Sequence, residues 1–186
     1  GLSVTPLQLA RAYAAIGNDG RLMTPTFVKG GAGEGEQVID PAIARQLMEM
    51  LETVTGPEGT ARRAAVTGYR VAGKSGTTRR SVAGGYEKRY VSMFAGIVPV
   101  QQPRFAMVVA IHDPSAGAYY GGAVSAPIFH NVMDGALRLM DVPPDNIEQW
   151  FAEQARKTAP RAAVATAPVQ APATLPAGGD AAGALR

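Results

Sequence analysis

The sequence contains no cysteine, which excludes disulfides, thiol catalysis and zinc sites built from thiolates. It also lacks an apolar run long enough to span a bilayer, and no signal peptide opens the chain. We interpret its two histidines, His112 and His130, as structural residues. We therefore expect no metal site and no cofactor.

The net charge of the chain comes entirely from its C-terminal end. The stretch 155–186 consists mostly of Ala, Pro, Thr and Gly without apolar periodicity, and it holds the entire net charge of +3. Such a composition buries too little surface to offset its ordering entropy, so we expect a disordered tail over 151–186. Residues 1–150 then form one folded unit, whose formal neutrality argues against nucleic-acid binding.

Three segments show helical periodicity. Thr5-Pro6 and Asp40-Pro41 each combine an N-cap residue with proline at the first helical position. We expect helices from Pro6 to Ile16, from Pro41 to Val54 and from Ser125 to Met140. The apolar residues expected on their inner faces are Leu9, Tyr13 and Ile16 in the first helix, Ile43, Leu47, Met50, Leu51 and Val54 in the second, and Phe129, Met133, Ala136, Leu137 and Met140 in the third.

The period changes to that of strands after residue 68. We expect three strands over 69–73, 90–100 and 104–112, and the tight connection Pro99–Pro103 makes an antiparallel hairpin of the last two. The run 105–111 is apolar on both faces, which predicts a central strand that is covered on both sides. Short extended pieces are expected over 26–28 and 37–39. The whole pattern predicts an α+β fold, with an antiparallel sheet covered by helices.

One tetrapeptide, the lysine motif Lys74-Ser75-Gly76-Thr77, carries the chemistry but fits two classes of enzyme. The stretch Gly68–Ser75 satisfies the phosphate-loop pattern G-x-x-x-x-G-K-[ST], and Asp113 follows an apolar strand as a magnesium-holding aspartate does. A nucleotide triphosphatase is therefore one alternative. Against it, a phosphate loop needs a helix that begins at the lysine. The glycines, threonines and arginines after Lys74 form helices poorly.

The second interpretation places the lysine motif on a strand. Val71–Thr77 resembles the third catalytic motif of penicillin-binding protein transpeptidases, the Lys-Thr-Gly element of a sheet edge. Segments 1–16, 94–96, 119–122 and 125–127 resemble the helix, strand, loop and final helix around that motif in class B enzymes. The likeness is strongest to the division-specific enzyme that cross-links septal peptidoglycan. It implies serine acyl transfer from a D-Ala–D-Ala stem peptide, and inhibition by β-lactams.

By this resemblance, the four residues of the lysine motif have separate roles. Lys74 supplies positive potential near the nucleophile, and the hydroxyls of Ser75 and Thr77 bind the terminal carboxylate. Gly76 admits the substrate backbone, because a Cβ there would obstruct it. The backbone N–H of Thr77 forms half of the oxyanion hole. Four further residues are expected at the pocket, one as a cation and three as its aromatic wall: Arg79, Tyr90, Tyr119 and Tyr120.

The resemblance also implies partners, a location and a missing part. The partners are the stem peptide, β-lactam antibiotics and other septal cell-wall synthesis proteins, and the location is the periplasmic side of the bacterial inner membrane. None of the serines begins the Ser-x-x-Lys or Ser-x-Asn pattern that the family needs, and the chain opens on Gly1. We therefore expect the C-terminal part of a longer enzyme. A third alternative is a non-catalytic domain that senses peptidoglycan or β-lactams.

The isolated 186-residue chain is therefore expected to form no stable adduct with penicillin, because it contains no Ser-x-x-Lys nucleophile. Intact-mass spectrometry after incubation with benzylpenicillin tests this, with a complete penicillin-binding enzyme as the positive control. A mass increase of one penicillin on this chain would contradict the prediction.

Overall fold

The structure, a computed structural model, describes residues 3–158. In chain order its elements are α1 (Pro6–Gly17), β1 (Arg21–Leu22), β2 (Glu36–Gln37), α2 (Pro41–Glu52), the 3₁₀ turns η1 (Thr53–Thr55) and η2 (Arg62–Ala64), β3 (Ala72–Val82), β4 (Gly85–Val98), β5 (Phe105–His112), α3 (Gly121–Leu139) and α4 (Ile147–Thr158). Helices and an antiparallel sheet are combined, so the predicted α+β class is confirmed.

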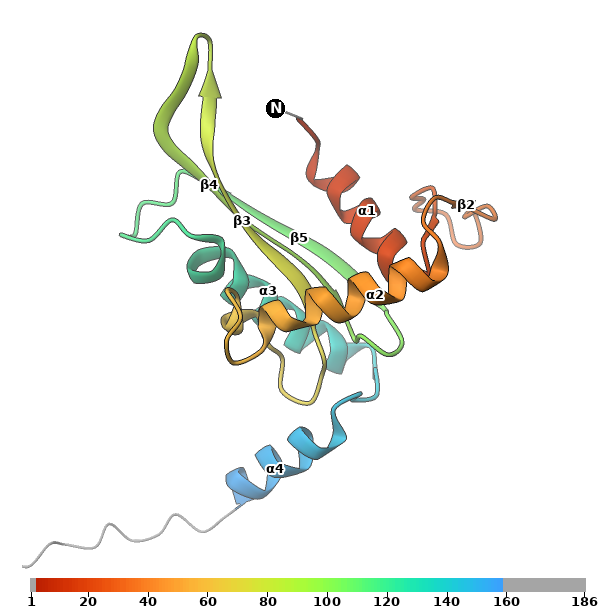
Figure 1. Cartoon of the computed structure of the whole chain (residues 1–186). Helices are drawn as coiled ribbons and strands as arrows, with labels where there is room; N and C mark the ends of the chain where they lie inside the picture. Colours follow the sequence, from red (N-terminus) through yellow and green to blue (C-terminus); the bar gives the residue numbers. More distant parts are fainter. Residues whose placement is uncertain (1–2, 159–186) are drawn as a thin grey trace, which may run out of the picture.

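The main sheet contains three antiparallel strands in the order β3-β4-β5. Strand β3 pairs with β4 from Ala72↔Ile97 to Val82↔Gly85, with an irregularity between Arg79 and Ser81. Strand β5 pairs with β4 only from Val91↔His112 to Val98↔Phe105. The outer half of the β3–β4 hairpin therefore projects beyond the rest of the sheet (Figure 1).

Two apolar clusters lie on opposite faces of this sheet. The larger joins α3 to β4 and β5, and it includes the edge-on contact of Phe94 with Phe129, whose ring centroids lie 4.9 Å apart. The smaller joins α1 and α2 to the other face around Met48, Ala72 and Ile97. Figure 1 shows this layering, with α1 and α2 on one side of the sheet and α3 on the other.

The strands differ from the sequence prediction in extent and position. Strand β3 begins at Ala72 and continues to Val82, because pairing with β4 keeps the polar residues after the lysine motif extended. Strand β5 is covered by α1 and α3 but forms an edge of the described sheet, so its predicted central position is wrong for residues 3–158. The predicted extended piece 26–28 is also wrong, because Thr26 accepts a hydrogen bond from the Val28 N–H and bends the chain.

Helices α1 and α2 begin where their capping residues predict, whereas α3 begins earlier than expected and α4 was not expected. Thr5 and Gln8 form a capping box at α1, and Asp40 caps α2. Helix α3 begins at Gly121, before the predicted start at Ser125. Helix α4 crosses the domain boundary predicted after residue 150, and the Asn146 N–H before it donates to the Gly68 carbonyl at 3.0 Å. The remainder of the predicted tail, 159–186, lies outside the described residues.

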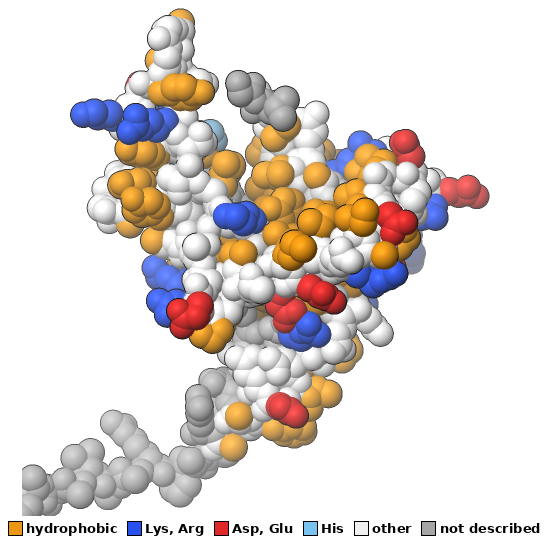
Figure 2. Space-filling model, viewed as in Figure 1, with side chains coloured by type: hydrophobic (Ala, Val, Ile, Leu, Met, Phe, Trp, Pro, Cys, Tyr) orange, Lys and Arg blue, Asp and Glu red, His pale blue; other side chains and the backbone are white. Residues whose placement is uncertain are grey.

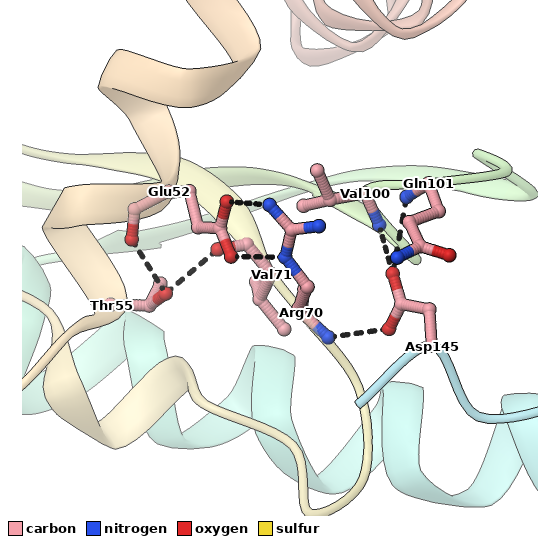
Figure 3. Close-up of polar contacts among 7 residues, drawn as sticks. All are labelled: Glu52, Thr55, Arg70, Val71, Val100, Gln101 and Asp145. Atoms are coloured by element: carbon pink, nitrogen blue, oxygen red, sulfur yellow. Dashed lines mark hydrogen bonds and ion pairs between the residues drawn. The ribbon is translucent and has the colours of Figure 1, made fainter. Parts of the chain in front are cut away.

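A polar cluster fixes the entry to β3 (Figure 3). Arg70 donates from Nε and Nη2 to the two carboxylate oxygens of Glu52, both at 2.6 Å, and this hydrogen bonding raises the pKa of Arg70. The Arg70 N–H donates to Asp145 at 2.7 Å. The other Asp145 oxygen accepts from the N–H groups of Val100 and Gln101 at 3.0 and 3.1 Å. One carboxylate therefore ties three backbone donors from two strand connections to the segment before α4.

The first residue of α3 lies directly on the sheet. A Cβ atom at Gly121 would be 2.2 Å from the Met93 carbonyl oxygen and 2.6 Å from that of Gly76. Real Cβ atoms do not approach backbone this closely, so only glycine fits here. Gly135, further along the same helix, has no atom within 4 Å of such a Cβ.

Asp145→Ala is expected to lower the free energy of unfolding by about 1–3 kcal/mol, because it leaves three backbone donors without their acceptor. Asp134→Ala is the matched control, since that carboxylate forms only an i,i+4 ion pair with Arg138 and its loss should cost at most about 0.5 kcal/mol. Urea unfolding measures both changes. Equal effects of the two substitutions would contradict the prediction.

Gly121→Ala and Gly135→Ala are expected to have opposite effects although both lie in α3. The first forces the helix away from the sheet and should destabilise the fold by about 1–3 kcal/mol. The second should stabilise it by up to about 1 kcal/mol, because alanine is the better helix former. Thermal unfolding of the two variants checks this, and destabilisation by both would show that the contact at Gly121 is not the cause.

Candidate active site

The lysine motif lies on β3, which pairs with β4 alone, so its outer edge is open within residues 3–158. Side chains alternate along a strand, which separates Lys74 from Ser75 and Thr77. Ser75 and Thr77 lie opposite Phe94 and Ser92, whose side chains are buried on the α3 face. Lys74 therefore lies on the face that α1 and α2 cover further along the sheet.

A cavity of about 520 Å³ opens beside the two hydroxyls of the motif. Its walls come from β3, from η2 and the segment that precedes it, and from the start of α3. The residues that line it are Gly59, Thr60, Arg62, Arg63, Ser75, Thr77, Tyr120, Gly121, Gly122 and Ala123. Three Ser and Thr hydroxyls, two arginines and the N-terminus of a long helix give this cavity the chemistry of an anion site.

Each motif hydroxyl already has one hydrogen-bond partner at the cavity. The Thr77 Oγ1 accepts from the Gly121 N–H at 3.1 Å. The Ser75 Oγ lies 3.0 Å from the Thr60 Oγ1, and either oxygen can donate. Because the Gly121 amide can only donate, the proton of Thr77 is left for another acceptor.

Lys74 is exposed, and its Nζ donates to the Ser75 carbonyl oxygen at 2.9 Å. It does not line the cavity of Ser75 and Thr77. No carboxylate among residues 3–158 forms an ion pair with it. Its positive charge is therefore available to a group on the opposite face of β3.

The three predicted aromatic residues lie together at one end of the cavity. Tyr90 stacks on Tyr119 with ring centroids 4.2 Å apart, and the rings of Tyr119 and Tyr120 are 4.4 Å apart. The Tyr119 hydroxyl donates to that of Tyr120 at 3.2 Å, which raises the pKa of Tyr119. Arg79 lies opposite Tyr90 in the strand register. Its positive charge acts to lower the pKa of Tyr119, against the effect of that hydrogen bond. Only Tyr120 of this group lines the cavity itself.

Sequence reasoning missed the wall that the segment 59–63 contributes. Thr60 contacts Ser75 across fifteen positions of sequence, and the Arg63 side chain donates to the Ala123 carbonyl oxygen at 2.9 Å. The two adjacent arginines, Arg62 and Arg63, were the only local signal for this wall, because a pair of cations suits a site that binds an anion. A loop is placed only by its tertiary partners, which the sequence alone does not reveal.

The structure does not support the phosphate-loop alternative. Lys74 and Ser75 lie inside a strand that continues to Val82, where a phosphate loop would need a helix that begins at the lysine. Asp113, the proposed magnesium ligand, instead forms ion pairs with Arg80 and Arg89.

Comparison with known proteins agrees with this geometry. The family model described as penicillin binding protein transpeptidase domain matches residues 1–134. Peptidoglycan D,D-transpeptidase FtsI of Escherichia coli K12 is 49% identical over 148 residues, which is 78% of this chain and 25% of that protein. Probable peptidoglycan D,D-transpeptidase PbpC of Pseudomonas aeruginosa is 42% identical over 150 residues, covering 79% of this chain and 26% of its own length.

A solved structure extends the likeness to three dimensions. The apo TP domain of Burkholderia pseudomallei penicillin-binding protein 3 matches with a TM-score of 0.69 and 42% identity, over 78% of this chain and 45% of that one. The chain spans about a quarter of the length of the curated relatives it matches. Matching sequence, a shared fold and the lysine motif on an open sheet edge lead to one conclusion: this chain belongs to the penicillin-binding protein transpeptidase family.

Proposed function

We propose that this chain forms one wall of the active site of a peptidoglycan D,D-transpeptidase that cross-links stem peptides during septal cell-wall synthesis and reacts with β-lactams. The observation that carries the proposal is the lysine motif on the open edge of β3, with Ser75 and Thr77 facing a cavity that suits a carboxylate. Membership of the transpeptidase family supplies the reaction class.

The cavity accounts for recognition of the terminal D-Ala carboxylate. A carboxylate accepts hydrogen bonds only, and Thr77 has its proton free because the Gly121 N–H occupies one of its lone pairs. The N-terminus of α3 and the nearby Arg62 and Arg63 add positive potential. A β-lactam carries a carboxylate in the corresponding place, so the same groups serve both ligands.

The open edge of β3 accounts for how the peptide is held. An extended peptide can add to an unpaired strand through main-chain hydrogen bonds. A Cβ atom at Gly76 would meet only the Met93 side chain, at an ordinary 3.5 Å. Packing inside the chain therefore does not require glycine at this position, which supports a requirement set by the ligand.

The acyl transfer itself needs a serine from outside these 186 residues. Its hydroxyl oxygen attacks the carbonyl carbon of the penultimate D-Ala, an ester forms, the C–N bond breaks, and the terminal D-Ala leaves with the transferred proton. An amine of a neighbouring strand then attacks the ester, forming the cross-link and restoring the serine. Lys74 contributes positive charge beside this serine, and the Thr77 N–H contributes to the oxyanion hole.

A hollow beside the projecting hairpin is a candidate place for the segment that carries the nucleophile. It has a volume of about 780 Å³ and lies between the projecting hairpin and α1. Its lining combines apolar side chains (Val4, Pro6, Leu9, Val91, Met93, Val108 and Ala110) with polar and charged ones, among them Thr78, Arg79, Arg80 and His112. Figure 2 shows hydrophobic side chains on both sides of it. Exposed apolar surface of this kind marks an interaction site. Lys74 lies on this face of the sheet, so we expect the nucleophile's segment to cover it.

The proposed location is the periplasmic side of the bacterial inner membrane, among other septal cell-wall synthesis proteins. None of the helices between residues 3 and 158 combines the length and hydropathy that a membrane-spanning segment requires.

A chimera tests the proposal. In the Escherichia coli FtsI relative, the matched segment is replaced by the corresponding residues of this chain. Fluorescent penicillin should label this chimera covalently, and Lys74→Ala should slow labelling by about 100-fold or more, because charge stabilisation is lost at the reacting centre. Lys88→Ala, an exposed lysine on the adjacent strand, is the matched control and should change the rate less than about twofold.

Rescue of division in cells depleted of the relative tests the septal role separately. Loss of covalent labelling in the unsubstituted, correctly folded chimera would overturn the enzymatic proposal and favour a sensing domain. Labelling without rescue of division would overturn only the septal assignment.

A further inference from the structure

We propose that Thr60 is a positioning residue: its hydroxyl donates to the Ser75 hydroxyl, so that Ser75 directs its own proton at the substrate carboxylate. This inference rests on the proposed function and adds a residue that the lysine motif does not contain. It concerns the side-chain contact between Thr60 Oγ1 and Ser75 Oγ, which are 3.0 Å apart.

Proton accounting selects one direction for this hydrogen bond when a carboxylate is bound. Each hydroxyl has one proton and can accept as well as donate. A carboxylate accepts only, so Ser75 must donate to it and must then accept from Thr60. In the reverse direction Ser75 would donate its proton to Thr60. A lone pair of the Ser75 oxygen would then face the anion, which is repulsive.

With this direction, each of the two motif hydroxyls accepts one hydrogen bond from elsewhere in the chain. Thr77 receives a hydrogen bond from the Gly121 N–H at 3.1 Å, and Ser75 receives one from Thr60. In both cases a donor from another part of the chain leaves the motif's proton free for the ligand. Chains of hydrogen bonds also polarise one another, which strengthens the bond from Ser75 to the anion.

The backbone around Thr60 is fixed closely enough to aim its side chain. A Cβ atom at Gly59 would lie 2.1 Å from the Val54 carbonyl oxygen, and one at Gly122 would lie 2.0 Å from the carbonyl oxygen of Thr60 itself. The next residue, Ala61, is buried and donates its N–H to the Val54 carbonyl at 2.9 Å. Threonine is also stiff at χ1 because it is branched at Cβ.

Three substitutions in the chimera test the inference. Thr60→Val keeps the branched shape and removes only the hydroxyl, whereas Thr60→Ser keeps the hydroxyl. Thr53→Val is the matched control, because the exposed Thr53 hydroxyl donates to the Met50 carbonyl at the end of α2 and lines neither the cavity nor the hollow. Acylation rates are measured with benzylpenicillin and with its methyl ester, which lacks the anion.

Thr60→Val should slow acylation by benzylpenicillin about three- to tenfold, the range expected for one hydrogen bond. It should change the rate with the methyl ester less than about twofold, a split that a general structural defect would not produce. Thr60→Ser should restore most of the benzylpenicillin rate, and Thr53→Val should leave both rates unchanged.

A double-mutant cycle shows whether Thr60 acts through Ser75. In a Ser75→Ala background, Thr60→Val should cost nothing more, because the hydroxyl that it orients is gone. Equal losses with both penicillins, or additive losses in the double variant, would overturn the inference while leaving the proposed function intact. An unsubstituted chimera that is not acylated would overturn both.

Discussion

The contact of Gly121 with the backbone of two strands is the constraint on which the candidate site depends. At this point the start of α3 is pressed against Gly76 and Met93 without room for a side chain. The contact places the Gly121 N–H on Thr77 and brings the neighbouring Gly122 against the Thr60 carbonyl. One close approach thus positions a helix N-terminus, a motif hydroxyl and the loop that contacts the second hydroxyl.

An open edge strand must be held rigidly from elsewhere, and two kinds of interaction do this for β3. At its beginning, the Glu52 and Asp145 carboxylates fix Arg70 through its side chain and its N–H. Along its length, β4 pairs with every motif residue and buries Phe94 beneath Ser75. The outer edge of β3 therefore stays open to a ligand while the strand is held from its other side.

Signals that act over a few residues predicted much of this fold. Proline with a capping residue predicted the starts of α1 and α2, and the period-two segments predicted the β4–β5 hairpin. Signals that depend on tertiary partners failed. Ile43 and Met50 of α2, expected on the inner face, are 52% and 63% exposed, because the helix instead turns Ala44 and Met48 inward. Periodicity defines an apolar stripe, but not which of its edges meets the sheet.

The candidate site also has one part that local sequence predicts and another that depends on tertiary contacts. The lysine motif could be predicted because its residue types and order carry the chemistry by themselves. Thr60 could not, because its meaning comes from a contact with Ser75 that exists only after the 56–68 segment has folded back onto β3. In the function proposed here the motif supplies protons to a carboxylate, and the direction of those protons depends on donors that the rest of the fold supplies. On that proposal, recognition of the anion is a property of the packed loop and helix as much as of the motif.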